Sequence, residues 1–151
     1  MSKPLRWLVV GGAAGLVLVV GIVAWQYWPV ALRYQRNRSV EAGRAVVRRY
    51  VDGQDSLDAA ACQLASEIRK LNALSLRIAS AEPGSRKRIV DEPRFVPLGT
   101  SPNDPRVQEV TLNAYRLTVP DWIPSEDRVR IKRMYDSTMR ARGLKVVECA
   151  A

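Results

Sequence analysis

The stretch LVVGGAAGLVLVV, residues 8–20, decides the fold of this chain, because its glycines suit two very different structures. A dinucleotide-binding turn places glycines at positions n, n+2 and n+5 between a strand and an amphipathic helix, with an acidic residue about 20 positions later. If Gly12 and Gly15 are the last two of these glycines, the first position is Val10. The following residues have no polar face, and the first acidic residue is Glu41. These departures argue against nucleotide binding.

The same stretch meets the requirements of a membrane-spanning helix. No residue from Trp7 to Trp25 is charged or strongly polar. A helix over residues 7–28 would be about 33 Å long, which matches a hydrocarbon core of about 30 Å. Pro29 follows, where a helix can kink or restart without losing a hydrogen bond inside the lipid. Aromatic side chains that suit the two lipid–water interfaces lie at the ends of this segment: Trp7, Trp25, Tyr27 and Trp28.

We expect an uncleaved single-pass anchor in the inner (plasma) membrane. The apolar core is longer than that of a secretory signal, and Ile22 stands where the candidate cleavage site prefers a small residue. The positive-inside rule compares the two flanks of the span. The tail, residues 1–6, offers Lys3, Arg6 and the α-amine, whereas the other flank offers Arg33, Arg36, Arg38, Arg44 and Arg48. By a small margin, this count predicts a cytoplasmic soluble part.

The amino-acid composition limits which partners and which catalytic or metal sites the chain can have. The protein has 151 residues, a net charge of +9 and no histidine. A basic protein suits anionic lipid headgroups, acidic partner surfaces or nucleic acid, although arginine-rich faces are often simply solvated. Without histidine, Ser-His and Cys-His dyads are excluded, and we expect no metal, haem or other cofactor. Cys62 and Cys149 could form a disulfide in an exported domain or remain two thiols in the cytoplasm.

Residues 29–80 predict a juxtamembrane basic helix followed by a heptad-like helix. Ser39 is a candidate N-cap of the first, Asp52-Gly53 a candidate stop, and Asp55 a candidate cap of the second. The second helix has a seam in steps of four and three, which we expect to pack on the preceding helix or on a partner: Leu57, Ala61, Leu64, Ile68, Leu71, Ser75 and Ile78. The arginines that could contact lipid phosphates or an acidic partner are Arg33, Arg36, Arg38, Arg44, Arg48 and Arg49.

Residues 81–105 form a proline-rich stretch that predicts an extended arm rather than a helix or an inner strand. Its apolar side chains, together with a tryptophan in the later PDWIP turn, are candidates for docking on a partner: Phe95, Val96, Leu98 and Trp122. In residues 106–151, Asp104-Pro105 predicts a capped helix to about residue 117, with a strand near Tyr115 as the alternative. A last helix should be capped by Ser125 and end at Gly143.

The fold class is therefore mainly α: one transmembrane helix followed by a small helical domain made of a hairpin, an extended arm and C-terminal helices. Within the span, the small residues Gly11, Ala14, Gly15 and Gly21 share one side, together with Leu18, where another membrane helix could approach closely. We expect a non-catalytic accessory subunit of a larger membrane complex, whose partners are other membrane-protein subunits and anionic lipids, with no small-molecule substrate.

Two other functions fit less well. The carboxylate pairs Asp91/Glu92 and Glu126/Asp127 could serve a tethered enzyme, but adjacent carboxylates usually lie in solvent or at helix starts. The Arg-rich surface could make the chain an adaptor for acidic partners or nucleic acid. Nucleic acid is the less favoured of these, because Phe95 is the one phenylalanine and aromatic residues do not alternate with the basic runs.

Overall fold

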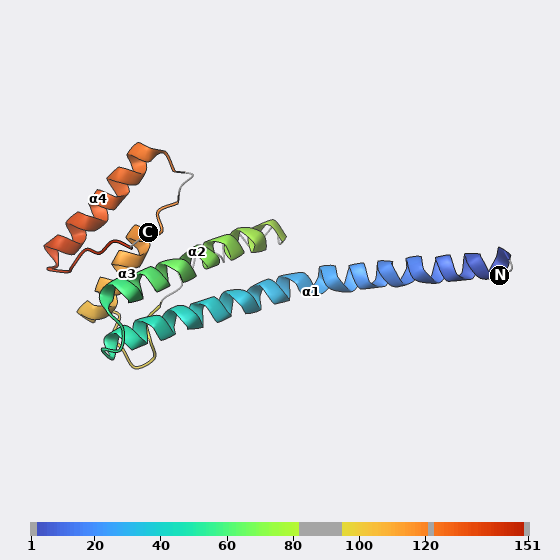
Figure 1. Ribbon diagram of the computed structural model, residues 1–151, viewed down its shortest axis with the longest axis horizontal. Helices are drawn as coiled ribbons and strands as arrows, with labels where there is room; N and C mark the ends of the chain where they lie inside the picture. The colour runs from blue at the N-terminus through green and yellow to red at the C-terminus, as the bar shows by residue number, and fades with distance from the viewer. Residues whose placement is uncertain (1–2, 82–94, 121–122, 150–151) are drawn as a thin grey trace.

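The computed structural model describes residues 3–81, 95–120 and 123–149, with side chains described over residues 16–77, 95–120 and 123–149. Four helices follow one another along the described chain: α1 (Lys3–Val51), α2 (Leu57–Ala81), α3 (Pro105–Leu117) and α4 (Ser125–Ala141). No strand occurs in the described ranges. The expected mainly helical fold, with a long apolar N-terminal helix and a smaller helical region after it, is confirmed (Figure 1).

Helix α1 is a single rod of 49 residues, about 73 Å long at 1.5 Å per residue. Pro29 lies inside it, so the helix does not restart there, and Ser39 is a mid-helix residue rather than an N-cap. A proline at position 29 cannot donate to the Trp25 carbonyl four residues earlier. The Trp25 carbonyl lies on a part of α1 that the rest of the described chain leaves uncovered, so water can satisfy it and the helix continues through Pro29.

The end of α1 and the start of α2 form the turn of a helical hairpin. Gly53, with φ of 74°, allows the chain to leave α1, which confirms the predicted stop at Asp52-Gly53. The cap of α2 differs from the prediction. The Ser56 hydroxyl accepts a hydrogen bond from the Ala59 amide at 3.3 Å, whereas Asp55 accepts from the Arg49 guanidinium at 2.8 Å. Asp55 therefore closes the hairpin turn instead of capping the helix.

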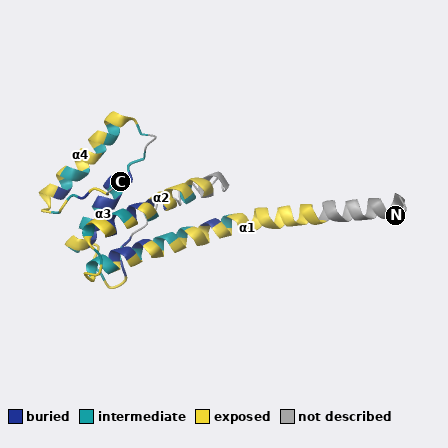
Figure 2. Cartoon of the chain, viewed as in Figure 1, coloured by how far each residue is buried: buried dark blue, intermediate teal, exposed yellow. Residues whose placement is uncertain are grey.

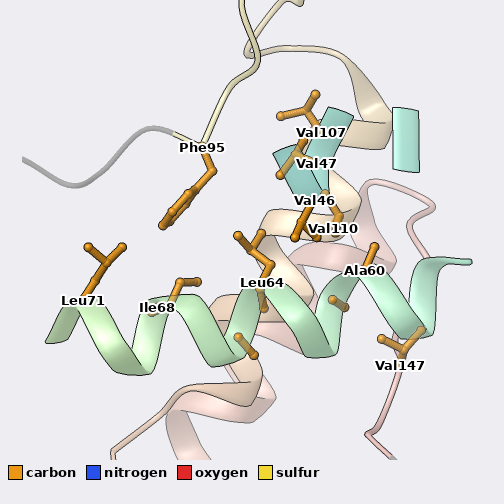
Figure 3. Packing of buried hydrophobic residues seen from close by; sticks show 13 residues of the cluster. Val46, Val47, Ala60, Leu64, Ile68, Leu71, Phe95, Val107, Val110 and Val147 are labelled. Atoms are coloured by element: carbon orange, nitrogen blue, oxygen red, sulfur yellow. The ribbon is translucent and has the colours of Figure 1, made fainter. Parts of the chain in front are cut away.

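The core lies where α1, α2 and α3 meet, at the end of the molecule away from the N-terminus (Figures 1 and 3). The predicted α2 seam provides much of it, because Ala61, Leu64, Ile68 and Leu71 are all buried. The seam packs on helices of its own chain, as a hairpin helix does. The other helices contribute Val46, Val47, Val107, Val110 and Ala114.

Helix α3 has the predicted bounds and cap. The Asp104 carboxylate accepts from the Arg106 amide at 2.9 Å, and Pro105 is the first helical residue. The alternative strand near Tyr115 is wrong, because Val107, Val110 and Ala114 bury a helical stripe that continues to Leu117. Two side-chain contacts hold α3 on the end of α1: Tyr50 Oη donates to Glu109 Oε2 at 2.7 Å, and Arg106 donates to the Val51 carbonyl at 2.8 Å.

Helix α4 packs on α3 and ends at Ala141, and Gly143, which has φ of 67°, follows the C-cap residue Arg142. Its cap differs from the prediction: Ser125 is the first helical residue, and Pro124 occupies the N-cap position without a side-chain hydrogen bond. After Gly143, residues 144–149 run in extended form back across α3 towards α2 (Figure 1). This C-terminal segment adds Val147 to the core.

Candidate functional site

The first half of α1 is the part of the molecule with the clearest functional character. It is long and apolar enough to span a membrane. From Leu16 to Ala31 no described side chain is buried, and Leu32 is the first buried one (Figure 2). This rod of exposed leucine, valine and isoleucine has no cover within the described chain. An apolar surface of this extent needs lipid or another protein around it.

The aromatic residues at the end of this rod lie on its surface. Trp25 is 83% exposed, and Tyr27 and Trp28 are also exposed. Nothing in the described chain packs over them, so their rings are open to the surroundings of α1. Trp7 lies in α1, but its side chain is outside the described residues.

The small-residue face lies largely outside the described side chains. Gly11, Ala14 and Gly15 are helical residues of α1 whose surroundings are not described. For Gly21, a Cβ would meet nothing within 4 Å. This side of Gly21 is therefore open for a neighbouring helix.

The six predicted contact arginines divide into two groups. Arg44 and Arg49 have partners within the chain: Arg44 donates to Glu41 at 2.6 Å, and Arg49 binds both Asp55 and Gln63 at 2.8 Å. Arg49 therefore fixes the hairpin turn. The other four (Arg33, Arg36, Arg38 and Arg48) lie exposed or half-buried along α1, and Arg33 among them also has an interaction within the chain.

Arg38 belongs to a cavity that sequence reasoning did not find. This cavity of about 370 Å³ lies between α1 and α2. Arg38 and Ser39 line it from α1, and Lys70, Leu74 and Arg77 line it from α2. The signal that could have found it is the spacing of Lys70 and Arg77, seven residues apart on one side of α2.

Two of the predicted docking residues, Phe95 and Val96, pack against the core of their own chain. Phe95 is 2% exposed and points into the core towards α2, beside Leu64, Ile68 and Leu71 (Figure 3). Val96 is half-buried against the same core. Leu98, by contrast, is 87% exposed and is the described residue of this group that a partner could reach. Trp122 and residues 82–94 of the arm lie outside the described residues.

Two buried polar side chains of α3 hold the C-terminal segment. Asn113 donates to the Lys145 carbonyl at 2.8 Å and accepts from the Val147 amide at 2.9 Å. Arg116 bonds Asp136 of α4 and Glu148 of the segment, each at 2.5 Å. The hydrogen bond that Arg116 donates to Glu148 raises the pKa of Arg116 and lowers the pKa of Glu148. Both groups are therefore held in their charged forms.

At the other end of α3, burial raises the pKa of Tyr50 to about 12, and the hydrogen bond to Glu109 acts in the same direction. Glu109 also accepts from the Lys145 amide at 2.7 Å. Tyr50 therefore stays a neutral donor in this contact. The arrangement joins α1, α3 and the C-terminal segment, and its partners are satisfied within the chain.

A disulfide between Cys62 of α2 and Cys149 of the C-terminal segment completes this attachment. The two cysteines are 87 positions apart in sequence, and their Cα atoms are 5.8 Å apart. Of the two alternatives that the sequence leaves open, the structure has the bonded form. Asn113, Arg116 and the disulfide therefore fix residues 144–149 over α2 and α3.

Of the two carboxylate pairs, the structure describes Glu126 and Asp127. Glu126 and Asp127 lie in the first turn of α4, and Asp127 pairs with Arg130 at 3.2 Å. Asp91 and Glu92 lie outside the described residues. Among the described side chains, no group of three or more Cys, Asp or Glu could hold a metal ion.

Comparison of the chain with protein-family models, with curated proteins and with solved structures finds no match. The functional argument therefore depends on the residues and geometry described above.

Proposed function

We propose that this protein is a non-catalytic, single-pass membrane subunit that docks on a larger membrane assembly and stabilises it. The observation that carries the proposal is the exposed apolar rod of α1, where no described side chain from Leu16 to Ala31 is buried. The helical domain supports it from the other side. The helical domain has its own hydrophobic core, and a disulfide attaches its C-terminal segment to α2. We therefore regard it as one folded unit at the end of the proposed membrane-spanning helix.

The open side of Gly21 and the glycines on the same side of the span supply a contact surface for another membrane helix. Close helix approach requires small residues, because a larger side chain keeps the two backbones apart. Leu98 supplies a second contact point, in the helical domain, because its side chain is exposed outside the core. These two features favour protein partners over lipid alone.

The experiment is affinity purification of the full chain from membranes in a mild detergent. We expect membrane proteins to co-purify in fixed stoichiometry. Gly11→Leu and Gly15→Leu should weaken this recovery while leaving membrane insertion intact. The matched control is Ala13→Leu, two positions from both Gly11 and Gly15 and therefore about 160° around the helix from each of them. Equal recovery with all three variants would refute a role of the glycine side in assembly.

The same purification tests the alternative adaptor role. Recovery of DNA or RNA with a steep salt dependence would favour a tethered nucleic-acid binder over an assembly subunit. A turnover that is lost on substitution of Glu126 or Asp127 would favour the enzyme interpretation instead.

We further propose that the anchor lies in the inner membrane with its helical domain in an oxidising compartment. The count of flanking charges predicts a cytoplasmic domain, but Arg44 is paired with Glu41 and belongs to the surface of the domain. The disulfide supports the opposite side, because cytoplasmic thiols are kept reduced. Lys3 and Arg6 would then be the cytoplasmic charges.

Protease added to spheroplasts separates the two topologies. We expect digestion of the helical domain from outside, and no labelling of Cys62 or Cys149 by a thiol reagent until a reductant is added. A protected domain with two reactive thiols would instead establish the cytoplasmic orientation. Neither result bears on the purification experiment, so the two parts of the proposal are tested separately.

A further inference from the structure

We propose that the outer face of α4 docks on an acidic surface of a partner protein. The inference rests on the proposed subunit function, and it names the chemistry of one partner. The exposed residues of this face lie within an arc of about 140° around the helix, and we call them the α4 face: Val129, Arg130, Arg133, Met134, Ser137 and Arg140.

Helix α4 is attached to the domain by its inner side alone. Met139 is its one buried residue, and α3 is the one helix of the described chain on which α4 packs. Much of the helix is exposed (Figure 2), including the large apolar side chains of Val129 and Met134. The described chain therefore leaves the α4 face uncovered.

The cations of the α4 face are available to a ligand. Arg133 and Arg140 form no ion pair within the part of the chain that the structure describes. Arg130 pairs with Asp127 of the preceding turn at 3.2 Å, yet its side chain remains 82% exposed. Such an exposed pair is weak, so the Arg130 guanidinium can also turn to a partner.

The acidic residues of α4 do not neutralise Arg133 and Arg140. Glu126 and Asp127 lie in the first turn, where the helix dipole favours a carboxylate. The third, Asp136, bonds Arg116 of α3. The face is therefore positive from Arg133 to Arg140, over about 10 Å of helix. A complementary partner surface carries carboxylates at a similar separation.

The residue types of the α4 face favour a protein over a nucleic acid. Val129 and Met134 place apolar side chains beside the arginines. Arginine and methionine are enriched where proteins bind one another. Binding of single-stranded nucleic acid uses exposed aromatic rings among the cations, but Tyr135, the one aromatic residue of α4, is half-buried. An acidic protein surface with an apolar patch matches both the charge and the apolar side chains.

The lipid headgroups around the proposed span are too far away to be this partner. Val51 lies 23 residues after Trp28, about 34 Å further along α1. Arg106 donates to the Val51 carbonyl and Arg142 to Gln108, so the end of α4 lies near that end of α1 (Figure 1). A span tilted by 40° still leaves about 26 Å. A headgroup layer of about 5–8 Å and a Debye length of about 8 Å together fall short of this distance.

The test places the photoreactive amino acid p-benzoylphenylalanine at position 137 of the full chain in its own membranes. Ser137 is exposed, and Arg133 and Arg140 lie one turn away on either side of it. After illumination, the crosslinked product is purified and digested, and mass spectrometry identifies the attached peptide. We expect a segment of another protein that carries several aspartates or glutamates.

Removal of the cations should weaken this crosslink. Arg133→Gln with Arg140→Gln should reduce its yield by about 2-fold to 30-fold, the range expected for the loss of two exposed ion pairs. Arg133→Lys with Arg140→Lys keeps the charge and should retain most of the yield. Arg133→Glu with Arg140→Glu should abolish the crosslink, and lysines in place of two carboxylates of the attached segment should restore it.

The chain offers a matched control for the charge and for the crosslinking position. Arg38→Gln with Arg48→Gln removes the same charge from two exposed residues of α1 and should leave the yield unchanged. The photoreactive residue at Ser66, an exposed serine of α2, should give little of the same product. Equal losses in the two double variants, or equal yields from positions 66 and 137, would overturn the α4 face as the docking surface.

The identity of the crosslinked species decides the choice of partner. A segment without carboxylates, a second copy of this chain, a phospholipid or a nuclease-sensitive product would each overturn an acidic protein partner. The absence of any crosslink at position 137 would do the same. Circular dichroism should show unchanged helix content in every variant, because the substituted side chains are exposed.

Failure of this inference is distinguishable from failure of the proposed function. Extraction of the protein by alkaline carbonate would defeat the membrane-subunit proposal itself. A protein that stays in the membrane and co-purifies with other subunits, but gives no crosslink to an acidic segment at position 137, would defeat only the α4 docking surface.

Discussion

The ring of Phe95 occupies the space that a side chain on Gly43 would need. A Cβ placed on Gly43 would lie 2.5 Å from Cδ1 and 2.6 Å from Cε1 of Phe95, and 3.2 Å from Cδ1 of Leu64. Gly43 is buried inside α1, about two turns before its end at Val51, where glycine is unfavourable for a helix by about 1 kcal/mol relative to alanine. The close approach of Phe95 explains why glycine is placed there.

Gly43→Ala should therefore destabilise the protein despite its better helix propensity. Overpacking a core costs about 1–3 kcal/mol, and the propensity gain of about 1 kcal/mol offsets only part of it. Denaturant unfolding of the full chain in detergent measures the difference. The double variant with Phe95→Leu should lose less than the two single losses combined, because the smaller side chain relieves the contact. A stabilised Gly43→Ala protein would contradict the arrangement.

Phe95→Ala and Leu98→Ala should differ in their effect on the free energy of unfolding, because Phe95 packs in the core and Leu98 is exposed. Phe95 is 2% exposed in the core, so its truncation should cost about 3–5 kcal/mol. Leu98 is 87% exposed, so its truncation should change the free energy of unfolding by less than about 0.5 kcal/mol. Thermal unfolding of both variants under the same conditions makes the comparison. Equal losses would mean that Leu98 is also packed.

Helical periodicity in the sequence predicts the helices of this chain. The seam of α2 and the Asp104-Pro105 start of α3 are local patterns, and the structure has both. The predicted helix caps that the structure contradicts also come from local patterns, but tertiary contacts decide whether such a residue caps a helix. Asp55 has the right chemistry for a cap, yet Arg49 takes its carboxylate because α1 and α2 meet at that turn. Ser39 could cap a helix, but α1 continues through Pro29 and removes the helix start.

The candidate site was harder to predict because its residues meet only after the hairpin closes. The position of Arg38 beside the predicted span marks it in the sequence, whereas Lys70 and Arg77 meet Arg38 only because α2 folds back along α1. The proline-rich stretch predicts a docking role for Phe95, because nothing in such a stretch indicates which apolar residue its own chain will bury. Likewise, the sequence left the state of Cys62 and Cys149 open, because pairing depends on distance in space.

The stability of the protein should depend on pH through Glu148. Arg116 lowers the pKa of Glu148, so the folded state favours the carboxylate more than the unfolded chain does. Such a group contributes stability above its unfolded pKa and loses it as the pH falls through the folded pKa. Glu148→Gln should therefore cost less than about 1 kcal/mol at neutral pH, because this side chain is 68% exposed.

The difference between wild type and Glu148→Gln should shrink as the pH falls below the ordinary carboxyl range. Denaturant titrations at several acid pH values measure it, with the disulfide intact in both proteins. A difference that stays constant from neutral to strongly acid pH would show that Glu148 acts through packing rather than charge.

Arg116 itself should matter far more than an arginine on the outer face of α4. Its side chain is 8% exposed, and it donates to Asp136, Glu148 and the Val147 carbonyl. Arg116→Gln removes both ion pairs and leaves the Asp136 carboxylate, which is 20% exposed, without its cation. Hydrogen bonds to charged groups contribute about 1.5–3 kcal/mol, so we expect a loss of that size.

The control for Arg116 is Arg130→Gln, which removes the same charge from a side chain that is 82% exposed and paired only within one turn of α4. Such a surface pair should change the free energy of unfolding by less than about 0.5 kcal/mol. Hydrogen exchange adds a local measurement, because the Val147 amide bonded to Asn113 should lose protection in Arg116→Gln and keep it in Arg130→Gln. Unchanged protection in both variants would mean that Asn113 and the disulfide hold the C-terminal segment without Arg116.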